Sequence, residues 1–230
     1  MIRVWLDTKD NLVHAFWRNR TIGLPLPPNQ DSIVIGAIDV GAPKNIGWAI
    51  LEGGRSQTGN DLDEFIKIFG RKANHKPSAL GFEAPLFIPL RSELAKITKQ
   101  RDGEAGRPWS AGAGATVTTI GLAIMTYTFS NLRRLVPNKS ATLDWNDWPS
   151  GDDLLIFEAF VSRSNHAGPG DHWKDALNAA QGFQHSIPDL AAANAVQADN
   201  AFSLVGACLM RTGWIESIHA LEQSCVVIRP

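Results

Sequence analysis

The sequence lacks an excess of charge of either sign. Its 230 residues contain 22 lysines and arginines against 23 aspartates and glutamates, so the formal net charge at pH 7 is −1. Proteins that bind nucleic acid mainly through long-range electrostatics, as histones do, carry a large positive charge. The charge balance excludes that class of protein.

Cysteines and long apolar runs are also scarce. The two cysteines, Cys208 and Cys225, have no Cys or His at metal-ligand spacing, which argues against a zinc site and a secreted disulfide scaffold. No run of about 18 apolar residues occurs, and charges interrupt every apolar stretch of the first 17 residues. We therefore expect a cytoplasmic protein with no membrane partner.

Three common motifs are missing from the chain. There is no GxxxxGK[ST] phosphate loop, no GxGxxG after a strand and no GxSxG nucleophile turn. These absences exclude the usual nucleotide-binding, dinucleotide-binding and serine-hydrolase sites.

The residues that are present predict a packed α/β domain. Hydrophobic residues make up 44% of the chain and charged residues 20%, as in soluble globular domains. Residues 1–30 predict an N-terminal strand pair and a proline-rich linker, and residues 31–230 the main domain. We expect strands at 33–40, 46–51, 79–82 and 153–161, helices at 61–69, 113–135, 171–184 and 189–213, and an edge strand at 225–229. This order predicts a mixed β-sheet with helices on both faces.

Four carboxylates stand inside otherwise apolar elements: Asp39, Glu83, Glu158 and Asp199. Burial of an ionised carboxylate costs several kcal/mol unless the group is paired or coordinates a cation. Because the sequence shows no comparable set of buried lysines or arginines, we expect Mg²⁺ or Mn²⁺ to neutralise them.

The chain resembles the ribonuclease H-like superfamily in several short motifs. The stretch IGAIDVGAPKNIGWAI looks like the opening hairpin of that fold, and RuvC-type resolvases open similarly. The motifs GFEAP, RDGEAGRP, IFEAF and ADNAFSLVGACL resemble, in that order, a family of uncharacterised domains regarded as ribonuclease H-like nucleases. The resemblance covers about residues 33–214.

This resemblance implies a metal-binding triad. Asp39 on the first strand and Glu83 on the fourth would be neighbours in the sheet, and Asp199 on the final helix would face them. Asp175 is the rival for the last position, because His172 and Asp175 stand three apart on one helix face, as in RuvC-type enzymes. Glu158 would be an accessory metal ligand or a sheet-pairing residue.

Two arginines are candidates for substrate binding. Arg101 and Arg107 lie in the most basic part of the chain, residues 86–110, and guanidinium groups bind phosphate bidentately. A solvated loop is the alternative interpretation of this segment.

The leading hypothesis is therefore a nuclease that uses carboxylate-bound Mg²⁺ or Mn²⁺ to hydrolyse phosphodiester bonds in nucleic acid. One alternative is an inactive binding or assembly module, in which some carboxylates would pair with arginines. Another is an actin-like ATP-binding domain, against which the length and the absence of a second phosphate loop argue. For a homodimer, the N-terminal strand pair and the C-terminal CVVIRP run are the candidates for pairing between subunits.

Overall fold

A computed structural model describes residues 32–104, 108–146, 148–149, 153–160, 171–198 and 200–229. The expected N-terminal strand pair and linker, residues 1–30, lie outside the described residues. None of the helices in the described part of the chain combines the length and hydropathy needed to cross a membrane.

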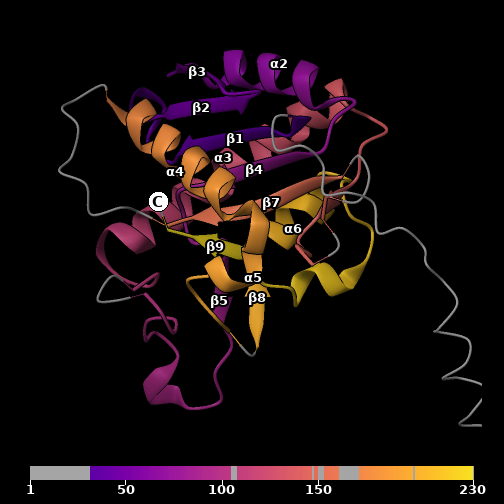
Figure 1. Cartoon of the computed structure of the whole chain (residues 1–230). Helices are drawn as coiled ribbons and strands as arrows, with labels where there is room; N and C mark the ends of the chain where they lie inside the picture. Colours follow the sequence, from indigo (N-terminus) through magenta and orange to yellow (C-terminus); the bar gives the residue numbers. More distant parts are fainter. Residues whose placement is uncertain are drawn as a thin grey trace, which may run out of the picture.

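The centre of the fold is a mixed sheet in which the strand order is β3-β2-β1-β4-β7-β6, and β9 also pairs with β7 (Figure 1). Strands β1, β2 and β3 are antiparallel neighbours, whereas β1–β4, β4–β7, β7–β6 and β7–β9 are parallel pairs. The strands are β1 (Val34–Asp39), β2 (Gly47–Glu52), β3 (Arg55–Gly59), β4 (Ser78–Phe82), β6 (Ala141–Thr142), β7 (Leu154–Ala159) and β9 (Val226–Ile228).

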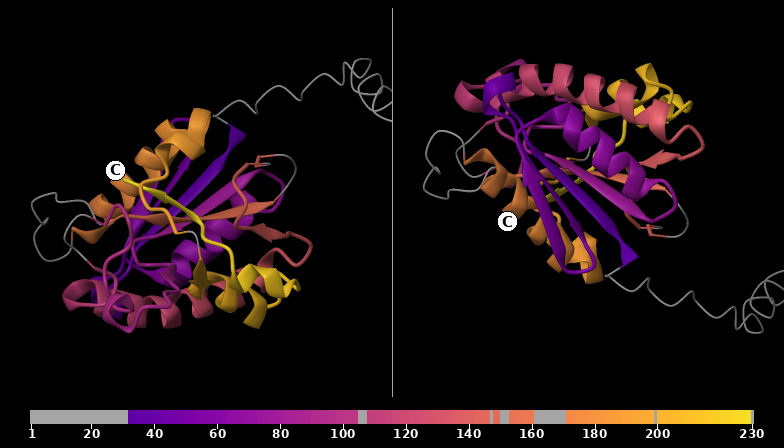
Figure 2. Two further views of the ribbon diagram at one scale, coloured as in Figure 1. Left: turned by 90° about the horizontal axis from the view of Figure 1, so that it is seen from below. Right: turned by 90° about the horizontal axis from the view of Figure 1, so that it is seen from above.

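Helices cover both faces of this sheet, as the sequence predicts. Figure 2 shows α4 on one side of the strands and α3 and α6 on the other. The helices are α2 (Leu62–Ala73), α3 (Gly112–Leu135), α4 (His172–Ser186), α5 (Leu190–Ala193) and α6 (Leu204–Arg211). One hydrophobic core joins α2, α3 and α6 to the sheet, and the other joins α4 and α5 to the opposite face. The molecule is therefore a three-layer α/β structure.

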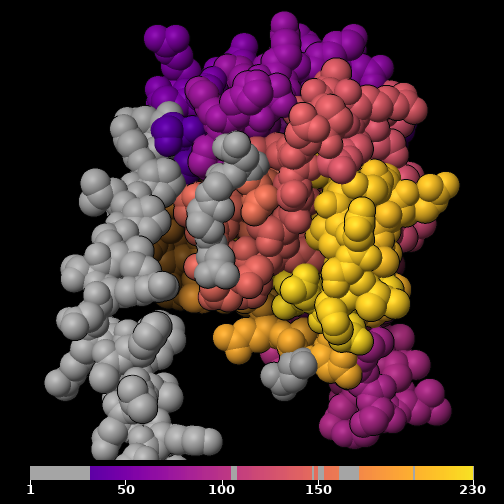
Figure 3. All heavy atoms as spheres, turned by 90° about the vertical axis from the view of Figure 1, so that its right-hand side faces the viewer, coloured from indigo at the N-terminus to yellow at the C-terminus, as the bar shows by residue number. Residues whose placement is uncertain are grey.

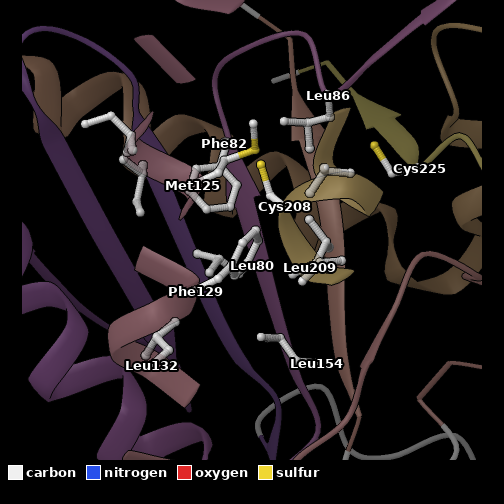
Figure 4. Close-up of a cluster of buried hydrophobic side chains, with 14 of the residues drawn as sticks. Leu80, Phe82, Leu86, Met125, Phe129, Leu132, Leu154, Cys208, Leu209 and Cys225 are labelled. Carbon is white, nitrogen blue, oxygen red and sulfur yellow. The ribbon is translucent and has the colours of Figure 1, made fainter. Parts of the chain in front are cut away.

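The larger core forms because alternate residues of the central strands point toward the same helices. Figure 4 shows Leu80 and Phe82 of β4 facing Met125 and Phe129 of α3, with Leu209 of α6 beside them. Phe82 and Phe129 meet edge to face, with ring centroids 5.5 Å apart. This packing fixes the position of β4 relative to α3 and α6.

Helix α2 begins where its sequence indicates, but it continues to Ala73, beyond the expected end at residue 69. The Asp61 side chain accepts hydrogen bonds from the backbone amides of Asp63 and Glu64, at 2.8 and 3.0 Å, which satisfies donors that the first helical turn leaves open. Arg71 and Lys72 occupy the last turn, where a positive charge is favourable.

The single helix expected at 189–213 is wrong. The segment contains the short 3₁₀ turn η4 (Ile187–Asp189), then α5, an extended stretch, β8 (Ala201–Ser203) and α6. The stretch runs beside β9, where the Ala195 amide donates to the Val227 carbonyl at 2.8 Å and the Val227 amide donates to the Asn194 side chain at 2.9 Å. Tertiary hydrogen bonds thus override the helix propensity of the alanines.

A small ribbon projects from the sheet. It pairs β8 antiparallel with β5 (Phe87–Pro89), which follows β4 closely in the chain. The chain then forms the 3₁₀ turn η3 (Leu94–Lys96) before α3, and another, η5 (Ile218–Leu221), after α6. The remaining 3₁₀ turn, η2 (Pro43–Asn45), connects β1 to β2.

Candidate metal centre

The candidate site starts at the carboxyl end of β1. The strand is buried along its length and ends at Asp39, whose side chain is 14% exposed. Residues 35 and 37 belong to the core beneath α4, and alternation places Asp39 on that same face. A carboxylate therefore stands at the sheet edge, under the first turn of α4.

Glu83 lies beside Asp39, as the resemblance implies. Strand β4 is parallel to β1, with Phe82 opposite Ile38, and the Glu83 amide donates to the Ile38 carbonyl at 2.9 Å. The side chains of Asp39 and Glu83 are joined by a hydrogen bond. Glu83 is 6% exposed, so this carboxyl pair is largely removed from water.

Helix α4 adds His172 and Asp175 to the pair, and a glycine makes the approach possible. Gly47 of β2 is paired with Asp39. A Cβ atom on Gly47 would lie 2.1 Å from the carbonyl carbon of His172. The first turn of α4 thus rests directly on the bare backbone of β2, next to Asp39.

The resulting cluster has the dimensions of a cation site. His172 Nδ1 lies 2.7 Å from Asp39 Oδ2, and one ligand atom each from Asp39, His172 and Asp175 all fall within 4.8 Å of one another. The His172 side chain is 36% exposed. The cluster is therefore partly open to solvent on the His172 side.

Electrostatics at Asp39 reflect the crowding of carboxyl groups. Burial is the largest influence on the pKa of Asp39 and raises it. His172, through its hydrogen bond and its charge, lowers this pKa, and so does the hydrogen bond with Glu83. The charge of Asp175 raises it. The net shift is upward, so the ionised form of Asp39 is disfavoured in the metal-free protein. A bound cation would remove this penalty.

The structure does not bring Glu158 to this cluster. Glu158 pairs in register with Phe82, and residues 154 and 156 of the same strand belong to the core beneath α3 and α6. The Glu158 side chain therefore points to the sheet face opposite Asp39 and Glu83. There it accepts a hydrogen bond from the Leu86 amide at 2.9 Å.

Arg101 is the partner of Glu158. The Arg101 guanidinium donates to both Glu158 oxygens, at 2.8 and 2.6 Å, and to Glu104 at 2.8 Å. Burial alone would lower the pKa of Arg101, but the charges and hydrogen bonds of the two glutamates raise it. The expectation that no buried arginine neutralises these carboxylates is wrong for Glu158. With 1% exposure, Arg101 faces the protein interior rather than a solvent-borne phosphate.

Two of the predicted site residues, Asp199 and Arg107, lie outside the described residues. Of the two rivals for the last carboxylate position, Asp175 is the one that the described residues place beside Asp39. Sequence reasoning did not list His172 among the ligands. The sequence feature that could have identified His172 as a ligand is its spacing three residues before Asp175, which places both side chains on one helix face.

The donor set suits a hard divalent cation. Carboxylate oxygens are the preferred ligands of Mg²⁺ and Mn²⁺, and a neutral imidazole nitrogen is compatible with Mn²⁺ and other first-row metals. Comparison with protein-family models, with curated proteins and with solved structures finds no match for this chain.

Proposed function

We propose that this protein is a divalent-metal-dependent nuclease of ribonuclease H-like fold. The observation that carries the proposal is the meeting of Asp39 and His172, 133 residues apart in the chain, with Asp175 and Glu83 at the same sheet edge. The adjacency of β1 to the strand that precedes Glu83 agrees with what the resemblance to that superfamily implies.

Each residue has a role that follows from its position. Asp39 lies between Glu83 on one side and His172 and Asp175 of α4 on the other, and it would be the central metal ligand. Asp175 and Glu83 would supply the other carboxylate oxygens. His172 contacts Asp39 through Nδ1 at 2.7 Å and would orient that carboxylate or supply a nitrogen ligand. A Mg²⁺ or Mn²⁺ ion held by these residues would supply an activated water and stabilise charge on a phosphate.

The binding-module alternative predicts carboxylates paired with arginines. Glu158 follows that pattern, because Arg101 binds both of its oxygens. Asp39 instead lies among acidic groups and a histidine. The geometry at Asp39 therefore favours the metal-dependent enzyme.

The test is thermal unfolding of the wild type and Asp39→Asn with and without Mn²⁺. A ligand at ten times its Kd stabilises a protein by about 1.4 kcal/mol, or roughly 3–6 °C for a chain of this size. We expect the shift in the wild type and its loss in Asp39→Asn. The control is Asp63→Asn on α2, which keeps an oxygen to accept the hydrogen bond from Tyr127 and should shift like the wild type.

Cleavage assays then address the reaction. Single-stranded, double-stranded, hybrid and branched nucleic acids are incubated with the wild type, Asp39→Asn and Asp63→Asn in Mg²⁺ or Mn²⁺. We expect metal-dependent products with the wild type and Asp63→Asn and none with Asp39→Asn. Equal Mn²⁺ shifts in all three proteins would refute the assigned ligands, and metal binding without cleavage of any substrate would favour the binding module.

A further inference from the structure

Exposed apolar side chains gather at one end of the molecule. The structure describes seven large hydrophobic residues that are markedly exposed, and five of them belong to the β5–β8 ribbon or the segments joined to it. Leu94 is the extreme case, with 83% exposure, and Ile218 follows with 68%. The other members are Leu90, Ile97 and Phe202. Such clustering marks an interaction surface.

Two segments of opposite charge adjoin the ribbon. We call residues 90–100 the arm, since they continue from β5, and residues 214–224 the corner, since they contain η5, which packs against β8. Phe202 of β8 is paired with Ile88 of β5, and strand alternation places Leu90 on the same outward face. The arm thus continues directly from one strand of the ribbon and the corner packs against the other, and Figure 3 shows the arm below the C-terminal part of the chain on one side of the molecule.

Hydrogen bonds from an arginine side chain hold the backbone of the arm in place. The Arg91 guanidinium donates to the carbonyls of Lys96, Lys99 and Gln100, at 2.8, 3.1 and 2.6 Å. At its base, Arg101 is anchored in the buried cluster with Glu158. The exposure of Leu94 and Ile97 is therefore a property of a defined surface.

Charge divides this surface into complementary halves. The arm contains three basic side chains and one acidic side chain, a net charge of +2, whereas the corner contains two glutamates and no lysine or arginine, a net charge of −2. The arm end of this surface is therefore positive and the corner end negative, and both segments adjoin the apolar ribbon. A twofold axis through the ribbon face would place each positive end on the negative end of a second copy.

We propose that this chain forms a twofold homodimer in which the arm of each protomer contacts the corner of its partner and the ribbon faces pack together. This proposal rests on a surface separate from the metal centre and does not depend on the proposed function. The corner also argues against nucleic acid or an anionic membrane as the occupant, because its glutamates would repel phosphates.

The C-terminal strand is a less suitable dimer contact. On the side away from β7, the backbone of Val227 already accepts from the Ala195 amide and donates to the Asn194 side chain. Little of that edge is left for a strand of a second chain. The arm and corner, by contrast, present side chains to solvent.

The first experiment measures the mass of the full chain by sedimentation over a range of concentrations. We expect a dimer in the wild type and at least about tenfold weaker association in Leu94→Ser. Because Leu94 is 83% exposed, the substitution should leave the circular-dichroism spectrum of the folded chain unchanged. Leu135→Ser is the matched control, since Leu135 is 46% exposed at the end of α3, away from the ribbon, and it should dimerise like the wild type.

The second experiment reverses the charges. One variant carries Lys96→Glu and Lys99→Glu in the arm, and the other carries Glu216→Lys and Glu222→Lys in the corner. Each variant alone places like charges together and should associate at least about tenfold more weakly than the wild type. A mixture of the two restores opposite charges at both contacts, so a heterodimer should form.

A monomeric wild type at 100 µM would overturn the proposal. So would a dimer that Leu94→Ser and both charge reversals leave intact, because a different surface would then hold it together. Tight nucleic-acid binding that the arm reversal abolishes, in a monomeric protein, would assign the arm to another occupant and also overturn the proposal.

Discussion

The contact between β2 and α4 can be tested with one methyl group. In Gly47→Ala the new Cβ would lie 2.1 Å from the carbonyl carbon of His172 and 2.2 Å from the amide nitrogen of Trp173. Ordinary contact needs about 3.4–4 Å. Both obstructing atoms are backbone, so the first turn of α4 has to move away from the sheet by more than about 1 Å.

This displacement has two measurable consequences. Overpacking of this kind costs about 1–3 kcal/mol, which corresponds to a fall of roughly 2–12 °C in the unfolding temperature of a chain of this size. The 2.7 Å contact between His172 Nδ1 and Asp39 Oδ2 would also lengthen beyond hydrogen-bond range. We therefore expect Gly47→Ala to lose both stability and the stabilisation by Mn²⁺.

The assay is thermal unfolding followed by circular dichroism, with and without Mn²⁺. The control is Gly54→Ala, where the added Cβ meets nothing within 4 Å but the positive φ of +72° imposes a backbone cost of about 1–2 kcal/mol. This control should lose stability and keep its metal shift. If Gly47→Ala keeps the wild-type unfolding temperature and metal shift, α4 does not rest on β2 as described.

Three further predictions concern buried ionisable groups. The pKa of Asp39 is raised, so the folded state binds the Asp39 proton more tightly than the unfolded state, and Asp39 lowers stability as pH rises through its folded pKa. Metal-free Asp39→Asn should therefore be at least as stable as the wild type at pH 7. Unfolding curves measured across pH should show that this advantage disappears below about pH 4. Arg101→Met leaves Glu158 and Glu104 buried without their cation and should cost about 3–5 kcal/mol in denaturant unfolding. Adding Glu158→Leu and Glu104→Gln to Arg101→Met should recover most of this loss, and a cost below about 1 kcal/mol for Arg101→Met alone would contradict the ion pairs. Burial raises the pKa of both the Cys208 and Cys225 thiols, so a thiol reagent at pH 8 should modify them only on unfolding, and rapid modification of the native protein would refute their burial.

The central architecture was predictable because its signals are local. The apolar run at 33–40, its turn and the run at 46–51 predict the antiparallel pair β1–β2, which the structure confirms. The apolar spacing at 61–69 and the long pattern at 113–135 predict α2 and α3, and α2 continues to Ala73. Strand β3, which is polar and largely exposed, carries no such pattern and was not predicted.

The partner of Glu158 could not be predicted from local sequence patterns. Its apolar strand was predictable, but the face to which the carboxylate points depends on the register of β7 with β4. That register places Glu158 beside Phe82, toward α3, and there it meets Arg101, 57 residues away. The sequence therefore indicated that buried Glu158 needs a cationic partner, but it did not identify Arg101 as that partner.

The sequence by itself determined the α/β class, the strand pair that carries Asp39, and the spacing that places His172 and Asp175 on one helix face, because each depends on residues close together in the chain. The tertiary structure alone decided which carboxylates meet. Gly47 admits α4 onto β2, and this packing brings His172 to Asp39 across 133 residues. Hydrogen bonds to β9 and β5 likewise broke the expected helix at 189–213. In both cases the deciding energy comes from contacts between distant segments, which no local pattern records.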